Sequence, residues 1–253
     1  MTEQSTPVRR ARLGRTLGPE PAAVGGAVLL LPNGQDVSDR RPSPLLAAAS
    51  VRALGGRLAR SGRAEGLAVH VVHYRYHGWN GDEAHPAHDA LWAVEEVVRR
   101  HGNVPVCLVG LGLGGRAALH AGGHEAVCSV VALAPRLPGD EAAIPPESVK
   151  QLVGRRVLIV HGTNDRRADP ELSFRFAERV KKVNRDVCRF EVHSDRQGLR
   201  QYRHEVAALT SDFVMGTLFG RAFSRPLQDA LAAPPPLGLR MPLAAGFGRS
   251  WRR

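Results

Sequence analysis

A glycine-rich turn at residues 110–115 is the segment of this chain whose residue types and spacing most suggest chemistry. It reads Gly-Leu-Gly-Leu-Gly-Gly and joins an apolar run to a segment of helical composition. Glycines in such a turn let backbone amides approach a phosphate, a carbonyl oxygen or another anion closely. Acid–base groups could come from Asp165, which follows the apolar run 156–161, and from His193, which ends the run 187–193.

Six short apolar runs must position these groups, and most of them lack the polar alternation of a half-exposed strand. They span residues 26–32, 67–74, 104–110, 127–134, 156–161 and 187–193. Between them lie apolar stripes with helical spacing, at 47–58, 90–97, 172–180 and 202–213. This alternation predicts an α/β fold with a mostly parallel sheet of about six strands and helices on both faces. Functional loops should then follow the carboxyl ends of the strands.

The flanks differ in composition from this central region. We expect a disordered N-terminal tail at 1–23, one domain at 24–218 and a basic C-terminal tail at 219–253. The last segment holds six arginines and one aspartate, and its Ala-Ala-Pro-Pro-Pro run at 232–236 cannot continue a helix. We expect a solvated tail there, although such a tail could also bind an anionic surface non-specifically.

Bulk properties narrow the class of protein. The three cysteines show no metal-ligand spacing and lie in apolar runs, which favours buried, reduced thiols and no metal or other cofactor. The N-terminus has no stretch of signal-peptide length, and the run 27–32 is too short to span a bilayer, so we expect a cytoplasmic protein. The net charge of +11 comes mostly from arginine, but aromatics make up only 5% of the chain, so specific nucleic-acid binding is not expected.

The glycine turn resembles the nucleophile elbow of the α/β hydrolases, whose pattern is G-x-S-x-G. Gly110 and Gly114 match the flanking glycines, while Gly112 stands at the nucleophile position. The resemblance covers about residues 24–218 and is to small bacterial enzymes of the esterase and dienelactone-hydrolase kind. Since glycine has no side chain to attack a substrate, the resemblance implies a degenerate nucleophile.

Other segments support the same family in the same order. The resemblance places the oxyanion hole at the backbone amides of Leu113 and of Asn33 or Gly34, which should persist whatever the side chains are. It places the acid of the triad at Asp165, which without a histidine partner could merely bond its own loop. The loop 74–81 also resembles a segment of these enzymes.

The histidine position is degenerate as well. An ungapped count back from Phe213–Val214 puts Gln197 there, and a slip of one residue would put Arg196 there. Neither can take a proton from serine near neutral pH. His193 is the one plausible substitute, although a strand-end histidine bonded to backbone or water is the plainer interpretation, and the same holds for His161. His204 should face solvent on the last helix.

Four hypotheses remain. The first is an impaired or inactive pseudo-hydrolase that binds a small molecule in the vestigial pocket. The second is an active hydrolase of esters, thioesters or lactones that uses Asp165 or His193 with the backbone oxyanion hole.

The third is a dinucleotide-binding protein, since the glycine spacing fits G-x-G-x-x-G, but the next strand ends at Ala134–Arg136 without the expected carboxylate. The fourth, nucleic-acid binding, depends on the arginine-rich flanks alone. Oligomeric state is not indicated.

Overall fold

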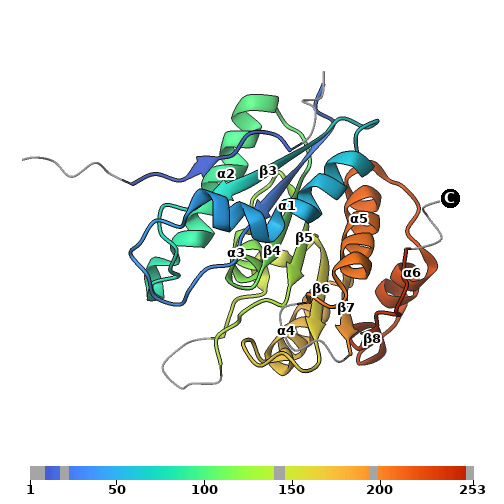
Figure 1. The fold of residues 1–253 in the computed structure, drawn as a ribbon. Coiled ribbons are helices and arrows are strands. Elements are labelled where there is room, and N and C mark those ends of the chain that lie inside the picture. The colour runs from blue at the N-terminus through green and yellow to red at the C-terminus, as the bar shows by residue number, and fades with distance from the viewer. Residues whose placement is uncertain (1–8, 18–22, 140–145, 194–198, 249–253) are drawn as a thin grey trace, which may run out of the picture.

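The computed structural model describes residues 9–17, 23–139, 146–193 and 199–248. At its centre lies an eight-stranded sheet in the order β1-β3-β2-β4-β5-β6-β7-β8, in which β1 is antiparallel to β3 and the other pairings are parallel (Figure 1). The strands are β1 (Arg12–Leu13), β2 (Gly26–Leu31), β3 (Leu67–His73), β4 (Val106–Leu111), β5 (Val127–Leu133), β6 (Arg156–Gly162), β7 (Val187–Val192) and β8 (Met241–Pro242).

Helices cover both faces of the sheet. The helices are α1 (Pro44–Ser61), α2 (His85–His101), α3 (Leu113–Ala121), α4 (Pro170–Val183), α5 (Arg203–Phe219) and α6 (Arg225–Ala232). Short 3-10 turns are η1 (Gly81–Glu83), η2 (Lys150–Leu152) and η3 (Leu237–Leu239). Apolar residues of α2, α3 and α4 form one core cluster with the sheet, and those of α1, α5 and α6 form the other.

The strand sequences explain why there are two cores. Successive side chains of a strand point to opposite faces, so Leu29 and Leu31 join one cluster while Val28 and Leu30 join the other. All six residues of β2 are buried, as a parallel strand covered on both faces requires. The predicted α/β fold, its six main strands and its four helical stripes are therefore confirmed.

The flanks are a correction to the sequence prediction. Instead of a solvated tail from residue 219, the chain forms α6, η3 and β8, with Leu227, Ala230 and Leu239 fully buried. In the expected N-terminal tail, β1 pairs with β3 through Arg12–His73 and Leu13–Val72. These strands are two residues long, so they leave no periodic pattern in the sequence. The expected helix stop is confirmed, because α6 ends at Ala232.

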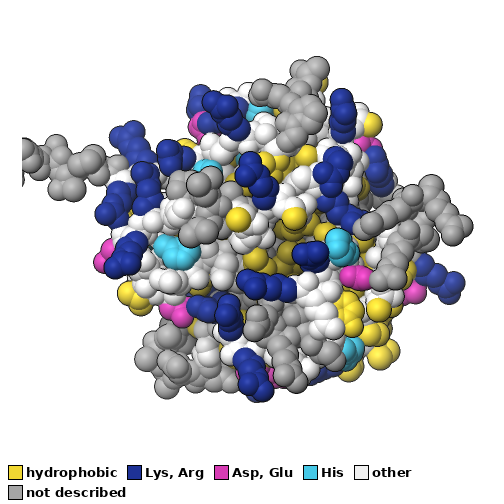
Figure 2. All heavy atoms as spheres, viewed as in Figure 1, with side chains coloured by type: hydrophobic (Ala, Val, Ile, Leu, Met, Phe, Trp, Pro, Cys, Tyr) yellow, Lys and Arg dark blue, Asp and Glu magenta, His cyan; other side chains and the backbone are white. Residues whose placement is uncertain are grey.

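The face formed by α1 and α5 is strongly basic. Figure 2 shows many lysine and arginine side chains on it, around a patch of apolar side chains. Across the described ranges, no helix is both long and apolar enough to cross a membrane.

Candidate active site

Gly112 forms the turn between β4 and α3 and has backbone angles φ 57° and ψ −118°. Residues other than glycine adopt this positive φ at a cost of about 1–3 kcal/mol, whereas glycine adopts it without strain. The turn is held firmly, because the Gly112 amide donates to Leu133 O over 2.9 Å and its carbonyl accepts from the amides of Gly115 and Arg136 over 3.0 and 3.1 Å. The backbone therefore has the sharp strand-to-helix shape of a nucleophile elbow.

The glycines on either side of Gly112 allow a close approach of backbone segments. A Cβ added at Gly110 would lie 2.5 Å from the Gly115 amide nitrogen, and one at Gly114 would lie 2.7 Å from the Leu31 carbonyl carbon. The atoms that such a Cβ would meet belong to the backbone, so they cannot shift easily to make room for it. The Gly-x-Gly-x-Gly pattern thus serves to pack β2, β4 and α3 together.

The side chain of Asn33 fills the space where a nucleophile would stand. Its Oδ1 accepts a hydrogen bond from the Leu113 amide at 2.9 Å. A Cβ added at Gly112 would lie 2.7 Å from the Asn33 Cγ and closer still to Oδ1. The amide of Leu113, expected from the sequence to form an oxyanion hole, is therefore bonded to an oxygen of the protein itself.

The loop after β2 is fixed by the segment that follows β3. Tyr74 donates through its hydroxyl to Pro32 O over 3.1 Å, and the Gln35 amide donates to His77 O over 2.9 Å. Gly34 is buried against this segment, and a Cβ there would lie 2.6 Å from His77 O. The residues on both sides of Asn33 are thus fixed, Pro32 by the Tyr74 hydroxyl and Gln35 by the His77 carbonyl.

Arg116, in the first turn of α3, links this segment to the far side of the elbow. Its guanidinium lies over the Trp79 ring, 3.8 Å from the centroid, and its Nε donates to Glu147 at 2.7 Å. Trp79 and Glu147 are both buried. A cation between a ring face and a carboxylate is a strongly preferred arrangement, so these contacts stiffen the wall of the site.

Asp165 follows β6, as expected for the acid, but its own loop uses its carboxylate. Oδ1 accepts from the amides of Arg167 and Ala168 at 2.8 and 3.3 Å. Oδ2 lies 3.9 Å from Nε2 of His161, and the side chain is 4% exposed. The carboxylate of Asp165 therefore bonds the amides of its own loop, which is the plainer of the two interpretations drawn from the sequence.

His161 is fully buried and engaged on both ring nitrogens. Nδ1 lies 2.9 Å from the Ser173 hydroxyl and Nε2 lies 3.1 Å from Ala168 O. Burial, together with the charge of Arg189, lowers the pKa of His161 to about 4, although Asp165 opposes the shift. At neutral pH the ring is therefore an uncharged structural group, as the plainer interpretation expected.

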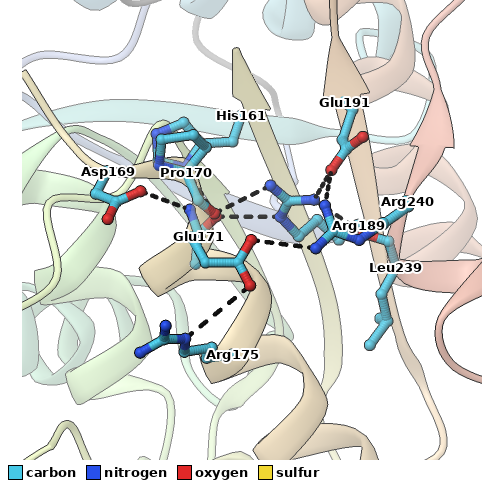
Figure 3. A network of polar contacts seen from close by, with 10 residues as sticks. His161, Asp169, Pro170, Glu171, Arg175, Arg189, Glu191, Leu239 and Arg240 are labelled. Atoms are coloured by element: carbon cyan, nitrogen blue, oxygen red, sulfur yellow. Dashed lines mark hydrogen bonds and ion pairs between the residues drawn. The ribbon is translucent and has the colours of Figure 1, made fainter. Parts of the chain in front are cut away.

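A network of charged groups adjoins His161 and ties the C-terminal segment to the sheet (Figure 3). Arg189 of β7 is 1% exposed and donates to Glu191 at 2.7 Å and to Leu239 O at 2.9 Å. Arg240 also donates to Glu191, at 3.2 Å, and to Glu171 of α4 at 3.1 Å. Sequence reasoning missed this network, because the charges lie in segments that were taken for a strand and a tail.

The structure does not bring the remaining candidates together. His193 is exposed and makes no hydrogen bond or ion pair to any described residue, so nothing joins it to Asp165 or Gly112. Gln197, like Arg196, lies outside the described residues. His204 is exposed in the first turn of α5, as expected.

The site offers few groups to a metal or cofactor. In the parts of the chain that the structure describes, no three histidine, cysteine or acidic side chains converge where they could hold a metal. A dinucleotide phosphate would need the Leu113 amide, which Asn33 occupies, and β5 ends without the carboxylate that would bind a ribose. What the described residues form is an elbow-shaped backbone with a carboxamide at its centre, and no hydrogen bond or ion pair among them joins an acid to a base there.

Comparison with known proteins supports the fold and no closer relation. No family model matches the chain, and no curated protein sequence matches it. Solved structures similar to it include an esterase of Pyrococcus furiosus (16% identity, TM-score 0.60, 77% of this chain and 82% of the esterase). A protein of Thermus thermophilus (18%, 0.58, 84% and 100%) and a lidless α/β serine hydrolase of Xanthomonas campestris (14%, 0.56, 84% and 90%) are also similar.

Proposed function

We propose that this chain, which has the α/β-hydrolase fold, has no hydrolytic activity and acts as a small-molecule-binding pseudo-hydrolase. The observation that carries the proposal is the contact of Asn33 with the elbow. The carboxamide occupies the space of a nucleophile side chain and its oxygen takes the amide that would stabilise an oxyanion. The arrangement thus lacks the attacking atom, and the Leu113 amide is not open to a developing negative charge.

The surroundings of Asp165 also support this proposal over an active hydrolase. Two loop amides and a buried, neutral His161 surround its carboxylate. A base that activates water must reach that water over a hydrogen-bond distance, and this carboxylate is directed into its own loop instead. Among the described residues, no acidic side chain bonds His193, so none of them orients its ring.

A cytoplasmic location belongs to the same proposal. Cys107, Cys128 and Cys188 are all free, and burial raises the pKa of the Cys107 and Cys188 thiols well above the usual value. Inert, unpaired thiols are typical of proteins in reducing compartments.

Labelling with a fluorophosphonate probe tests the loss of chemistry. We expect no labelling of the wild-type protein, and no ester, thioester or lactone turnover above buffer. Hydrolysis of such a substrate by the wild type, abolished by Asp165→Ala, would contradict the proposal.

Restoration of the triad tests the assignment of the elbow. Gly112→Ser alone should label poorly, because Asn33 occupies the space and the Leu113 amide. Gly112→Ser combined with Asn33→Ala and Gln197→His should give a reactive serine. If that triple variant folds, by circular dichroism, and still does not label, the elbow or the position of the histidine is assigned wrongly.

A further inference from the structure

A groove on the basic face of the molecule adjoins the elbow turn from the face of the sheet opposite α3. It runs between α1 and the start of α5 and has a volume of about 1340 Å³. That is larger than a typical small-molecule site of about 300–1,000 Å³. Figure 2 looks onto this face and shows an apolar patch at its middle with basic side chains around it. None of Gly112, Asn33 and Asp165 lines the groove.

The floor of the groove is apolar. Leu111 and Leu133, at the carboxyl ends of β4 and β5, contribute to it together with Leu54 of α1 and Leu199 and Val206 beside α5. Leu111 precedes Gly112 in the chain but packs with the α1/α5 core, whereas Leu113 packs with the opposite core. The groove therefore lies on the other side of the sheet from the α3 helix of the elbow, and an apolar chain could cover its floor.

The described side chains on the rim of the groove carry charge of one sign. Arg52, Arg57 and Arg60 come from α1, and Arg200 and Arg203 come from the other wall, while none of the described residues that line the groove is acidic. Among the described residues no carboxylate pairs with Arg52, Arg60 or Arg200. Elsewhere in the molecule arginines meet carboxylates, as in Arg75–Asp89, Arg116–Glu147 and Arg189–Glu191, each at 2.7 Å.

The guanidinium groups of Arg52, Arg60 and Arg200, which pair with no described carboxylate, lie around a low-dielectric floor and focus a positive potential in the groove. The positive end of the α5 helix dipole starts at Arg203 and adds to it. An anion in the groove would relieve the mutual repulsion of these arginines and could receive charge-assisted hydrogen bonds from more than one of them. Inorganic anions would leave the floor exposed, so the combination favours a ligand with an apolar part as well.

We propose that this groove binds a single-chain amphipathic anion, with a carboxylate or phosphate head among the arginines and an alkyl or acyl chain on the leucine floor. The assignment does not depend on whether the elbow is inactive. It gives the chain a ligand site that the α/β-hydrolase fold does not itself require, on the face formed by α1 and α5.

Calorimetric titration of the full chain with monomeric decyl phosphate and decanoate, below their micelle concentrations, tests the proposal. We expect saturable binding with one ligand per chain, much weaker binding of inorganic phosphate and none of the uncharged decyl maltoside. The variant Arg52→Ala/Arg60→Ala/Arg200→Ala should bind the two anions at least about tenfold more weakly. These side chains are exposed, apart from their part in the groove, so the fold should not depend on them.

Two further variants separate site binding from general charge. Arg10→Ala/Arg166→Ala/Arg185→Ala removes three exposed arginines that do not line the groove and should bind as the wild type does. Ala53→Trp places a bulky ring in the groove, leaves every arginine in place, and should also weaken binding.

The following results would overturn the proposal. Equal weakening by the two triple variants would mean that net charge alone attracts the anion. Unchanged binding in Ala53→Trp would place the ligand elsewhere. Binding to phosphatidylglycerol vesicles without binding to the monomeric anions would show a charged lipid surface as the partner and no ligand site. Fluorophosphonate labelling is expected to be unaffected by all these variants, so failure here is distinct from failure of the pseudo-hydrolase proposal.

Discussion

The turn after β4 and the segment formed by β6, β7 and the C-terminal residues contrast sharply in how they use their side chains. Around Gly112 the backbone has the strained shape that enzymes of this fold use for attack, yet the residues are glycines and the central side chain is a carboxamide. Around Arg189 the side chains are those expected of a catalytic centre, a histidine, carboxylates and a serine, yet each bonds a structural partner.

The contrast teaches that backbone geometry and side-chain chemistry are separable properties of a site. The elbow persists because Gly110 and Gly114 let β2, β4 and α3 pack closely, which is a requirement of the fold. The charged groups persist because they hold the C-terminal segment to the sheet. Neither observation requires a reaction, so each region can be tested by its effect on stability.

The largest expected effect is in the charged region. Glu191→Leu leaves the 1%-exposed Arg189 without its carboxylate partner, which should lower the free energy of unfolding by about 3–5 kcal/mol in urea titrations. Arg189→Met added to Glu191→Leu should recover part of that loss, because it removes the unpaired charge.

Glu171→Gln is the control. Its pair with Arg240 is 44% exposed on both sides, and the free energy of unfolding should fall by about 1 kcal/mol or less. Equal losses from Glu191→Leu and Glu171→Gln would show that burial of the network has no consequence.

A pH titration of stability should show the second effect. The pKa of His161 is about 4 in the folded protein and 6.5 when exposed, so the unfolded chain binds more protons between these values. The stability from the neutral ring is complete above pH 6.5 and is lost as the pH falls to 4, by up to about 3 kcal/mol. His161→Gln should lack this part of the pH dependence, measured as the difference between wild type and variant at pH 7 and pH 4. A difference that is the same at both pH values would mean that His161 is not buried neutral.

The stability of the elbow should depend on whether a side chain fits at its glycines. Gly114→Ala places a methyl group against the carbonyl of Leu31, and we expect a loss of about 1–3 kcal/mol in urea unfolding. Gly139→Ala is the matched control, because a Cβ at Gly139 has no neighbour within 4 Å, and its effect should be within about 0.5 kcal/mol. If both substitutions are harmless, close packing does not explain the glycine pattern.

The smallest effect should come from Asn33. Asn33→Ala removes one hydrogen bond to the Leu113 amide at an exposed position where water can replace it, so stability should fall by about 1 kcal/mol or less. Gln35→Ala, which trims an exposed neighbour in the same loop, should change stability less than Asn33→Ala does. A larger effect of Gln35→Ala would mean that the Asn33 contact contributes nothing.

Much of the fold could be predicted because strands buried on both faces must be apolar throughout. The runs 26–32 and 156–161 therefore lie within a residue or two of β2 and β6. The short β1 and β8 could not be predicted, since backbone pairing over two residues requires no particular side chains. The arginines and prolines around Leu227 and Leu239 likewise obscured a segment that is buried by only a few apolar contacts.

The site was predictable only where backbone geometry dictates residue type. Gly112 was identifiable because a turn between flanking glycines constrains what can stand there. The contact of Asn33 with Leu113 joins residues 80 positions apart and depends on a side-chain rotamer, which no local pattern encodes. The roles of Glu191 and Arg240 were hidden for the same reason, because their partners come from different elements.

The two short strands have a consequence for how copies of this protein meet one another. Strands β2–β7 are mostly apolar and buried, and a sheet of such strands with an open margin would be a template for strands of another molecule. At one margin β1 covers β3, and at the other Pro242, which has no amide hydrogen to donate, ends the brief pairing of β8 with β7. Removal of either cover should therefore promote aggregation before it abolishes folding, so the residues that look most dispensable in the sequence protect the solubility of the chain.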